Sequence, residues 1–514
     1  MFEKLTQGVY TIAEMSANHA GKLENALEIV RAAKEAGADC LKIQTYTADT
    51  LTLDCDNEYF RIEGGLWDGY TLHDLYKEAY TPWEWHGPIQ AECRKVGLDF
   101  LSTPFDATAV DFLEELGVEF YKIASFELVD IPLIEYTASK GKPMVISCGL
   151  GSPEDIGEAL VACRRMGNEQ VILLKCCSEY PANWADMNLA VIPEMQARFG
   201  VPIGLSDHSM GSLAAVVAVS MGACVVEKHF CLSRAIKNPD SAFSMEPEEF
   251  CQLVRYTQAA RQIRGQGGYR LTPSETSSLA FRKSIFVSKP IVKGQPFTAN
   301  CVRVVRPGYG LRPSFWNEVL EATAARDLLP GQPLHLGDIE EKSLFLPRLK
   351  NLDFESERLL FRGIRLEDSA DISRWRSDEA IIRWFKNPHK VTLSGQEQWF
   401  GRYTEDATRL DFMVEEKASG QNIGVVGLQS IDYGIGNGEI AYLIGEKQSQ
   451  NKGYATEAVM RLEKLAKEIL LLRRLVCTVH PQNLPSLRLA ERLGYAQIEA
   501  GDFLTFEKSL GSKK

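Results

Sequence analysis

Two histidines, His208 and His229, stand at the ends of two β-rich segments that follow one another along the chain. Because successive residues of a strand point to opposite faces, Ser206 shares a face with His208, and Glu227 shares a face with His229. Two imidazoles at neighbouring strand ends can bind one divalent cation and leave positions open for water and substrate oxygens, as in catalytic metal sites. This ligand set suits Mn²⁺, Zn²⁺, Co²⁺ or Fe²⁺. Each histidine taken singly could instead be a core or capping residue.

Two lysines fall inside other β-rich segments, Lys42 beside Gln44 and Lys122 shortly before Ser125. Burial of an ammonium group costs several kcal/mol unless an anion compensates it. Lysines that point into a barrel therefore predict a bound phosphate or carboxylate, or an amine that forms a Schiff base. If both lysines instead point outward between helices, they predict neither a bound anion nor a Schiff-base amine.

Hydroxyl and carboxyl side chains occur near the same predicted strand ends. The hydroxyl groups could hold a small phosphorylated carboxylate, and the carboxyl groups could transfer protons or bind sugar hydroxyls. The hydroxyl set is Thr103, Ser125, Ser178 and Ser206, and the carboxyl set is Glu14, Glu127 and Asp240. Isolated acidic residues more commonly lie on the surface or cap helices, so that alternative stays open for the second set.

A repeated strand–helix pattern from residue 9 to about residue 265 must position these side chains. Eight units of about thirty residues, with no glycine-rich dinucleotide turn after the first strand, favour a (β/α)₈ TIM barrel over an open doubly wound sheet. The segment 47–81 is too long for an ordinary connection and is expected to cover the barrel mouth. The strands are predicted at 9–17, 40–46, 99–104, 120–125, 143–148, 171–177, 202–208 and 224–230.

The chain has 514 residues, and at about 100–200 residues per domain it is expected to hold three domains. The barrel is placed at 1–265, and a Gly/Pro/Ser-rich stretch ends it. A small β-rich domain is placed at 280–345, and a predicted linker follows at 346–355. A separate α/β domain is placed at 355–510.

The composition excludes several classes of protein. Hydrophobic residues make up 45% and charged residues 25% of the chain, with a net charge of −12 and no basic block. These values are typical of a globular protein and predict neither nucleic-acid nor membrane binding. The 12 scattered cysteines show no metal-binding spacing and are expected to be reduced thiols. With no leader segment and no long apolar run, we expect a soluble cytoplasmic protein.

Seven short motifs in the first 230 residues resemble the sialic acid synthase family. They are Ile12-Ala13-Glu14, Asn18-His19, Leu41-Lys42-Ile43-Gln44-Thr45, Ser102-Thr103-Pro104-Phe105, Tyr121-Lys122-Ile123-Ala124-Ser125, Gly204-Leu205-Ser206-Asp207-His208 and Glu227-Lys228-His229-Phe230. Within that family, the stretches 60–67, 239–247 and 306–311 resemble pseudaminic acid synthases more than neuraminate synthases.

The resemblance implies condensation of phosphoenolpyruvate with 2,4-diacetamido-2,4,6-trideoxy-L-altrose to give pseudaminic acid and phosphate. It also implies an antifreeze-like (SAF) domain after the barrel, dependence on Mn²⁺, Mg²⁺ or Co²⁺, and a domain-swapped homodimer. By motif, the metal ligands would be His208 and His229, with Glu14 as a further catalytic residue. Phosphoenolpyruvate would be bound by Lys42, Thr103, Lys122, Ser125, Ser178 and Ser206, and neuraminate synthases have Asn in place of Ser178. The sugar would contact Glu127, Tyr180, Asp240 and, from the partner's SAF domain, Arg306.

The last domain is similar to the GNAT superfamily of acetyltransferases. Its turn 450–455 follows a predicted strand at 438–444 and opens a helix, so backbone N–H groups there could bind the pyrophosphate of acetyl-CoA. The resemblance implies acetyl-CoA contacts from Gln450, Lys452, Gly453, Tyr454, Ala455 and Asn483. Candidate bases for the acceptor amine are Glu439, Tyr442 and His480. The segment 372–387 faintly resembles enzymes that acetylate a 4-amino sugar nucleotide, although another amine remains open.

Three other hypotheses stay open at this point. The barrel could be an N-acetylneuraminate or legionaminate synthase, with the acetyltransferase acting on another amine. It could be a metal-free aldolase that forms a Schiff base with pyruvate through Lys42 or Lys122. It could also be a sugar-binding barrel without catalysis, which the full set of lysines and histidines disfavours.

Overall fold

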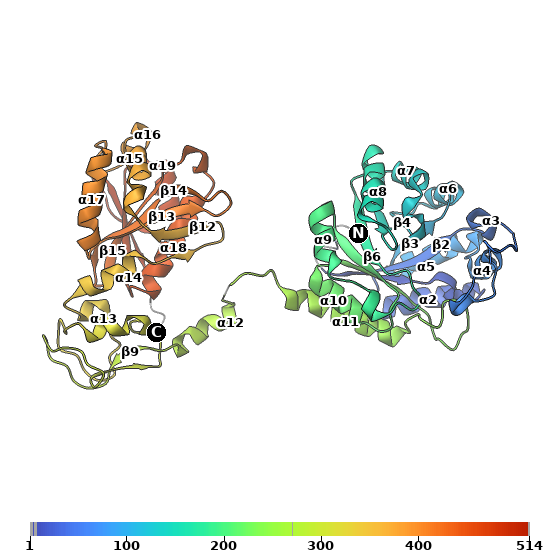
Figure 1. Cartoon of the computed structure of the whole chain (residues 1–514), viewed down its shortest axis with the longest axis horizontal. Helices are drawn as coiled ribbons and strands as arrows, with labels where there is room; N and C mark the ends of the chain where they lie inside the picture. Colours follow the sequence, from blue (N-terminus) through green and yellow to red (C-terminus); the bar gives the residue numbers. More distant parts are fainter. Residues whose placement is uncertain (1–3, 5–7, 270, 512–514) are drawn as a thin grey trace. The chain divides into compact units, whose positions relative to one another are not determined.

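The computed structural model describes Lys4 and residues 8–269 and 271–511. The chain divides into two compact units, 1–269 and 270–514, and each is described by itself (Figure 1). None of the helices in the described ranges combines the length and the hydropathy that a membrane span requires.

The first unit is a closed barrel of eight parallel strands in the order β1 to β8, which confirms the predicted fold. The strands are β1 (Tyr10–Glu14), β2 (Cys40–Thr45), β3 (Asp99–Pro104), β4 (Tyr121–Ile123), β5 (Met144–Ser147), β6 (Val171–Cys176), β7 (Ile203–Asp207) and β8 (Val225–His229). The first strand was predicted too long, at 9–17, because Ser16 takes a φ of 44° and the chain turns into a short 3₁₀ helix, η1 (Ser16–His19).

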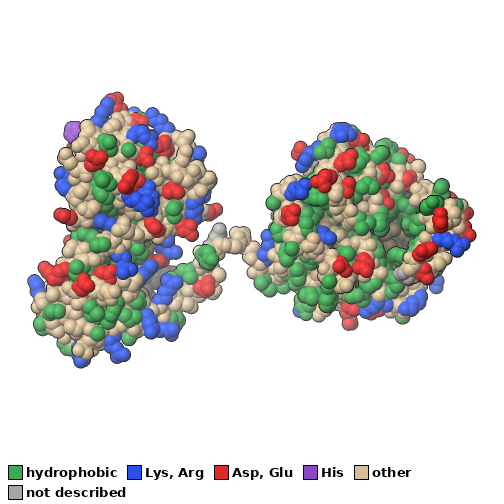
Figure 2. All heavy atoms as spheres, in the orientation of Figure 1, with side chains coloured by type: hydrophobic (Ala, Val, Ile, Leu, Met, Phe, Trp, Pro, Cys, Tyr) green, Lys and Arg blue, Asp and Glu red, His purple; other side chains and the backbone are tan. Residues whose placement is uncertain are grey.

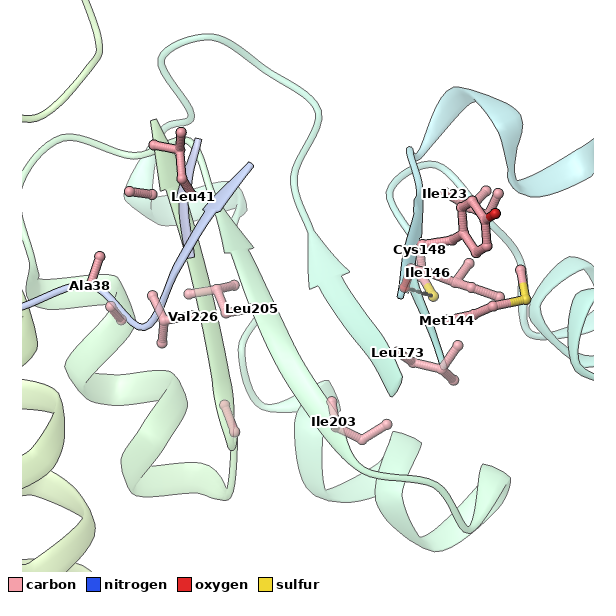
Figure 3. Close-up of a cluster of buried hydrophobic side chains, with 14 of the residues drawn as sticks. Ala38, Leu41, Ile123, Met144, Ile146, Cys148, Leu173, Ile203, Leu205 and Val226 are labelled. Carbon is pink, nitrogen blue, oxygen red and sulfur yellow. Dashed lines mark hydrogen bonds between the residues drawn. The ribbon is translucent and has the colours of Figure 1, made fainter. Parts of the chain in front are cut away.

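Helices cover the outside of the barrel. They are α2 (Leu23–Glu35), α5 (His86–Val96), α6 (Ala107–Leu116), α7 (Ile131–Ala138), α8 (Pro153–Arg165), α9 (Val191–Phe199), α10 (Leu213–Met221) and α11 (Pro247–Arg264). Outward strand residues such as Ile146, Leu205 and Val226 are buried beneath them (Figure 3). The sequence sets the helix ends locally: the Asp106 carboxylate accepts the N–H of Thr108 at 2.6 Å where α6 begins.

The long connection 47–81 contains α3 (Ala48–Leu51), η2 (Gly65–Trp67) and α4 (Leu72–Ala79). The indole N–H of Trp67 donates to the Pro239 carbonyl at 3.2 Å, and its ring lies 5.8 Å from that of Tyr180. Both partners belong to connections that leave the carboxyl ends of strands. The connection therefore lies against the barrel mouth, as predicted.

The second unit begins with a small β-rich module and continues into a large sheet. The module pairs β9 (Ser284–Val287) with β10 (Val302–Val305) and carries α13 (Trp316–Leu320). The sheet order is β11 (Phe354–Glu355), β12 (Leu359–Gly363), β13 (Leu410–Glu416), β14 (Gln421–Asp432), β15 (Asn437–Ile444), β16 (Arg474–Val479), β18 (Leu504–Ser509) and β17 (Ala496–Glu499). Its helices are α15 (Ser369–Trp375), α16 (Glu379–Ile382), α17 (Leu393–Glu405), α18 (Tyr454–Glu468) and α19 (Leu484–Arg492).

The predicted linker at 346–355 is wrong. That stretch forms helix α14 (Leu346–Lys350) and strand β11, and Leu349 is buried. One cluster of buried apolar side chains runs from the β-rich module, with Ile285 and Phe345, into the large sheet, with Phe412. The two parts of this unit therefore share a core rather than being joined by a flexible tether.

Candidate functional site

Ion pairs connect inward-facing residues of four barrel strands. Below them, apolar residues such as Ile12, Leu101 and Ile172 close the barrel interior. Glu14 follows Ile12 by two residues on β1, so it faces the same way, one layer nearer the carboxyl end. The Nζ of Lys42, on β2, lies 2.9 Å from Glu14 Oε2 and 3.2 Å from Glu227 Oε1, on β8, and all three side chains are buried. The strand alternation that buries the apolar residues thus carries this charged layer to the carboxyl ends of the strands.

Lys122 adds a second buried cation to the same layer. Its Nζ donates to the Ser147 hydroxyl at 2.5 Å and to the Ile123 carbonyl at 2.9 Å, and it lies 4.0 Å from Glu227 Oε1. Burial lowers the pKa of Lys122. Both lysines point inward, which answers the question that the sequence left open.

The carboxylates of this layer have different protonation behaviour. Burial raises the pKa of Glu14 to about 6, against the opposing effect of Lys42. Burial also acts to raise the pKa of Glu227, but Lys122 and Lys42 outweigh it and hold that pKa below its ordinary value. Near neutral pH Glu14 can therefore exchange a proton more easily than Glu227 can.

The two histidines lie beside this layer with ring centroids 5.5 Å apart. His208 Nδ1 lies 2.9 Å from the Cys177 carbonyl and donates to it, so Nε2 is the nitrogen that a metal could occupy. Burial acts to lower the pKa of His208, but the neighbouring Cys176 outweighs burial and raises that pKa. His229 Nδ1 is buried with no hydrogen-bond partner among the described residues. Burial, and then the charges of His208 and Lys42, hold the pKa of His229 well below its ordinary value.

These observations fit a divalent metal at the histidine pair. A neutral imidazole with a free nitrogen is the form that binds a metal, and a carbonyl that fixes the other nitrogen is the usual support of such a ligand. Among the described residues, no third His, Cys, Asp or Glu completes a metal-binding group. The other coordination positions of a metal bound to the two histidines would be open to small oxygen ligands.

Hydroxyl groups converge next to Lys122. The backbone N–H of Gly149 donates to Ser125 Oγ at 3.1 Å. A Cβ atom on Gly149 would stand 2.3 Å from Ser178 Oγ and 2.7 Å from Ser125 Oγ, so only glycine lets both serines approach here. Thr103 Oγ1 is buried without a hydrogen-bond partner in the described structure, and Ser206 Oγ donates to Glu227 at 3.3 Å.

Three of the four residues predicted to contact a sugar lie on different connections of the barrel. The Tyr180 ring stacks 4.1 Å from His208. Asp240 accepts the N–H of Ala17 at 3.1 Å, and burial raises its pKa. Burial raises the pKa of Glu127 to about 7. Arg306 belongs to the second unit, where it is exposed and forms no ion pair with any described residue.

Two residues of the charged layer were absent from the predicted site. Glu227 joins both lysines and Ser206, and Ser147 holds Lys122. The alternation along β8 already placed Glu227 on the face of His229. Ser147 gave no such signal, since a single serine near a strand end is common.

In the second unit, the turn before α18 presents unused backbone N–H groups. Asn451 and Gly453 have φ values of 62° and 83°. The backbone N–H groups of residues 451–456 find no acceptor among the described residues. Together with the helix dipole they form an anion-binding N-terminus.

The side chains predicted to bind acetyl-CoA have varied environments. Gln450 Nε2 donates to the Ile444 carbonyl at 3.0 Å, and the Lys452 carbonyl accepts from Arg358 at 3.0 Å. Tyr454 is buried and its hydroxyl donates to Glu416, so it can offer only its backbone, as can Ala455. Asn483 Oδ1 caps α19 by accepting the N–H of Ser486 at 3.3 Å.

Two neighbouring strands of this sheet diverge. β15 and β16 run parallel and pair only at Asn437–Glu439 with Arg474–Val476, so the two strands part beyond Glu439, and we call this divergence the opening. Thr478 donates to Glu439 at 2.7 Å, and the His480 ring lies 5.4 Å from that of Trp384. Of the candidate bases, Glu439 and His480 therefore border this opening. Burial raises the pKa of the third, Tyr442, to about 12.

A closed parallel barrel with a charged layer at the carboxyl ends of its strands, followed by a sheet with an anion-binding turn, defines an enzyme of the TIM-barrel class. Residues 29–269 match the NeuB family, 282–340 the SAF domain and 358–496 the acetyltransferase (GNAT) domain. The GNAT domain implies the use of acetyl-CoA.

The first two thirds of the chain is similar to known synthases. The pseudaminic acid synthase of Campylobacter jejuni is 42% identical, over 65% of this chain and 97% of the relative. The pseudaminic acid synthase of Helicobacter pylori is 41% identical over 64% and 97%. The N,N'-diacetyllegionaminic acid synthase of Legionella pneumophila is 34% identical over 64% and 94%. A crystal structure of a putative spore coat polysaccharide biosynthesis protein E from Chromobacterium violaceum aligns with a TM-score of 0.53 and 28% identity, over 65% of this chain and 99% of that one. The chain belongs to the NeuB family.

Proposed function

We propose that the barrel condenses phosphoenolpyruvate with 2,4-diacetamido-2,4,6-trideoxy-L-altrose to give pseudaminic acid and phosphate. The observation that carries this proposal is the buried layer of Lys42, Lys122, Glu14 and Glu227 beside the His208–His229 pair. Support for the substrate comes from the relatives at 41–42% identity that are named pseudaminic acid synthases.

In this proposal phosphoenolpyruvate binds through its charges and oxygens. Lys42 and Lys122 neutralise the anion in a site where water is excluded, which strengthens each contact. Thr103, Ser125 and Ser178 donate hydroxyl hydrogen bonds, and Ser206 turns its hydroxyl from Glu227 to the substrate. Glu227 acts to raise the pKa of both lysines, and for Lys122 this opposes the burial that lowers its pKa.

The metal would be held by His208 Nε2 and a nitrogen of His229. When bound, it would supply positive charge next to the aldehyde oxygen of the open-chain sugar. We assign Mn²⁺, Mg²⁺ or Co²⁺ to this position. Glu127, Tyr180 and Asp240 would orient the sugar so that its aldehyde carbon faces C3 of phosphoenolpyruvate.

The bond changes balance with one water molecule. C3 of phosphoenolpyruvate forms a bond to the aldehyde carbon, water adds to C2, and the C2–O bond to phosphate breaks. The water gives up both of its protons: one goes to the departing phosphate, which leaves as HPO₄²⁻, and the other goes to the new alkoxide. Glu14 would transfer this proton, because a pKa of about 6 allows both of its forms near neutral pH.

Phosphate release tests the proposal. The full chain is incubated with phosphoenolpyruvate and a panel of N-acetylated hexoses, with and without chelator, alongside His229→Ala. We expect phosphate release with the diacetamido sugar, lost in the variant and on chelation, and a loss of Mn²⁺ binding in the variant measured by calorimetry. Chelator-resistant turnover by His229→Ala would contradict the metal assignment.

Two alternatives have distinct outcomes. Turnover only with the N-acetylneuraminate or legionaminate precursor would move the substrate to the class of the relative at 34% identity. Borohydride trapping of pyruvate on Lys42 or Lys122, without phosphate release, would instead support the Schiff-base aldolase.

We also propose a domain-swapped homodimer in which Arg306 reaches the partner's sugar site. Large apolar side chains stand exposed on connections that leave the carboxyl ends of the strands, among them Tyr59 at 80%, Leu150 at 79% and Trp184 at 60%, and apolar groups gather on this unit in Figure 2. Such a surface favours a covering partner. Mixing inactive His229→Ala with inactive Arg306→Ala chains should restore activity, because one of the two swapped sites is then intact. Continued inactivity of a mixture shown to form heterodimers would argue against the swap.

For the second unit, we propose transfer of acetyl from acetyl-CoA to the amine of a 4-amino-4,6-dideoxy sugar nucleotide. The free N–H groups of residues 451–456 and the parting of β15 and β16 support this activity. Mass spectrometry of products tests it, with the full chain carrying His229→Ala so that the barrel is silent. Acetylation of a finished nonulosonate, or of protein lysine alone, would replace the proposed acceptor.

A further inference from the structure

One cation in the acetyltransferase part has no protein partner. The Nε of Arg376 is buried and finds no hydrogen-bond acceptor among the described residues, and its guanidinium forms no ion pair with them. Its Cζ lies 5.4 Å from the centre of the Phe385 ring. Burial, with the charge of Arg409 adding to it, lowers the pKa of Arg376.

The neighbouring charges do not neutralise this guanidinium. Asp411 is the nearby buried acid, and its Oδ2 already pairs with Arg409 Nε at 2.5 Å. Two arginines and one carboxylate leave one positive charge in excess. A half-buried unpaired guanidinium is costly, while its planar fork suits a carboxylate or phosphate.

Phe385 connects Arg376 to the opening between β15 and β16. The residue before it, Trp384, lies against His480. The residue after it, Lys386, has its Nζ 3.3 Å from Thr478 Oγ1 and 3.6 Å from Glu439 Oε1. The same short segment therefore borders both the unpaired guanidinium and the candidate bases.

The strand register places Asp411 on the same face of the sheet as Glu439. Asp411 pairs with Gly427, and Gly427 pairs with Ala441, which is two residues from Glu439 and on the same face. Adjacent strands lie about 4.8 Å apart, so Asp411 and Ala441 are separated by about 10 Å. A Cβ atom on Gly427 would stand 2.0 Å from Asp411 Oδ1, so the carboxylate of Asp411 lies over β14, which is the strand between β13 and β15.

We infer that Arg376 binds an anionic group of the acetyl acceptor, which is therefore an amine that also carries a phosphate or a carboxylate. This inference rests on the proposal that the second unit acetylates an amine. A nucleotide sugar would place its diphosphate at Arg376, and a finished nonulosonate would place its carboxylate there. A polyamine acceptor would set its positive charge against the guanidinium and is disfavoured.

Calorimetry on the full chain tests the subsite. The protein is first saturated with CoA and phosphoenolpyruvate, so that the other two proposed phosphate sites are occupied, and is then titrated with UDP or with N-acetylneuraminate. We expect one of these probes to bind, with affinity lowered at least tenfold in Arg376→Met and less severely in Arg376→Lys, which keeps the charge but loses the fork. Arg383→Met is the matched control, because Arg383 also stacks on a ring, that of Trp384 at 4.4 Å, but is exposed; its affinity should stay within twofold of wild type.

The outcomes separate the two proposals. Binding of neither probe to the wild-type protein, or equal binding to Arg376→Met, overturns the subsite. A lower melting temperature of Arg376→Met with unchanged probe affinity assigns the residue a structural role and overturns it as well. Arg376-dependent probe binding without any acetyl transfer upholds the subsite and refutes the proposed acetyltransferase function.

Discussion

A buried ion pair on the outside of the barrel should hold the proposed metal ligands in place. Lys228 Nζ lies 2.7 Å from Asp207 Oδ2 and 2.5 Å from the Ser209 carbonyl, and the lysine and aspartate side chains are 1% and 0% exposed. Asp207 Oδ1 also accepts the N–H of Ser209 at 2.9 Å. Asp207 and Lys228 precede His208 and His229 directly, so the pair fixes the strand ends from which both imidazoles project.

Lys228→Met would leave the Asp207 carboxylate buried without its cation. Loss of one partner of a buried pair costs about 3–5 kcal/mol, against a typical domain stability of about 5–15 kcal/mol. The double variant Asp207→Asn/Lys228→Met should cost less than the sum of the single variants, because no lone charge remains. Affinity for Mn²⁺ should fall about tenfold in Lys228→Met, as for other residues that support metal ligands.

Hydrogen exchange and calorimetry would measure these effects. Exchange of peptides from β7 and β8 in increasing urea reports the stability of the first unit alone, and calorimetry reports the affinity for Mn²⁺. The control is Glu135→Gln, which breaks a surface pair with Arg165, whose side chain is 61% exposed, and should cost under about 1 kcal/mol. If Lys228→Met costs no more than the control, or leaves the affinity for Mn²⁺ unchanged, the positioning argument is wrong.

Three further predictions concern other parts of the chain. Lys122→Met should raise the KM for phosphoenolpyruvate at least tenfold while Mn²⁺ binding stays intact, since it removes a proposed charge-assisted contact to the substrate and none to the metal; a parallel loss of both would contradict this division of roles. The pKa of Glu127 is raised from 4.5 to about 7, so its contribution to stability is complete below pH 4.5 and is lost as the pH rises to 7. Glu127→Gln should flatten that slope in urea titrations, and an unchanged slope would count against the raised pKa. Phe345→Ala should cost about 3–5 kcal/mol and expose β9 and β13 to hydrogen exchange together, because Phe345 belongs to their shared core; loss of protection in β9 alone would show that the two parts fold separately.

Local patterns determined most of the barrel. Alternating and helical periodicities predicted all eight strands because each βα unit buries its own apolar stripe. The same alternation placed Ser206 with His208, and Glu227 with His229, on shared strand faces, while the direction of Lys42 and Lys122 stayed open. In the second unit the patterns were weaker, and β12, α17, α19, β17 and β18 were not assigned. Their apolar side chains, such as Leu359 and Phe361 of β12, are buried by contact with distant parts of the second unit.

The sequence by itself determined which side chains of a strand share a face, since that depends only on residue parity within the strand. Only the tertiary structure decided how these side chains pair. Glu227 takes its place between Lys42 and Lys122 because closure of the barrel brings β8, β2 and β4 around one axis. Likewise, the stretch 346–355 is short and mixed in polarity, so its helix and strand form only because the shared core buries Leu349. Residue contacts across many strands depend on long-range closure of the chain, which no local pattern encodes.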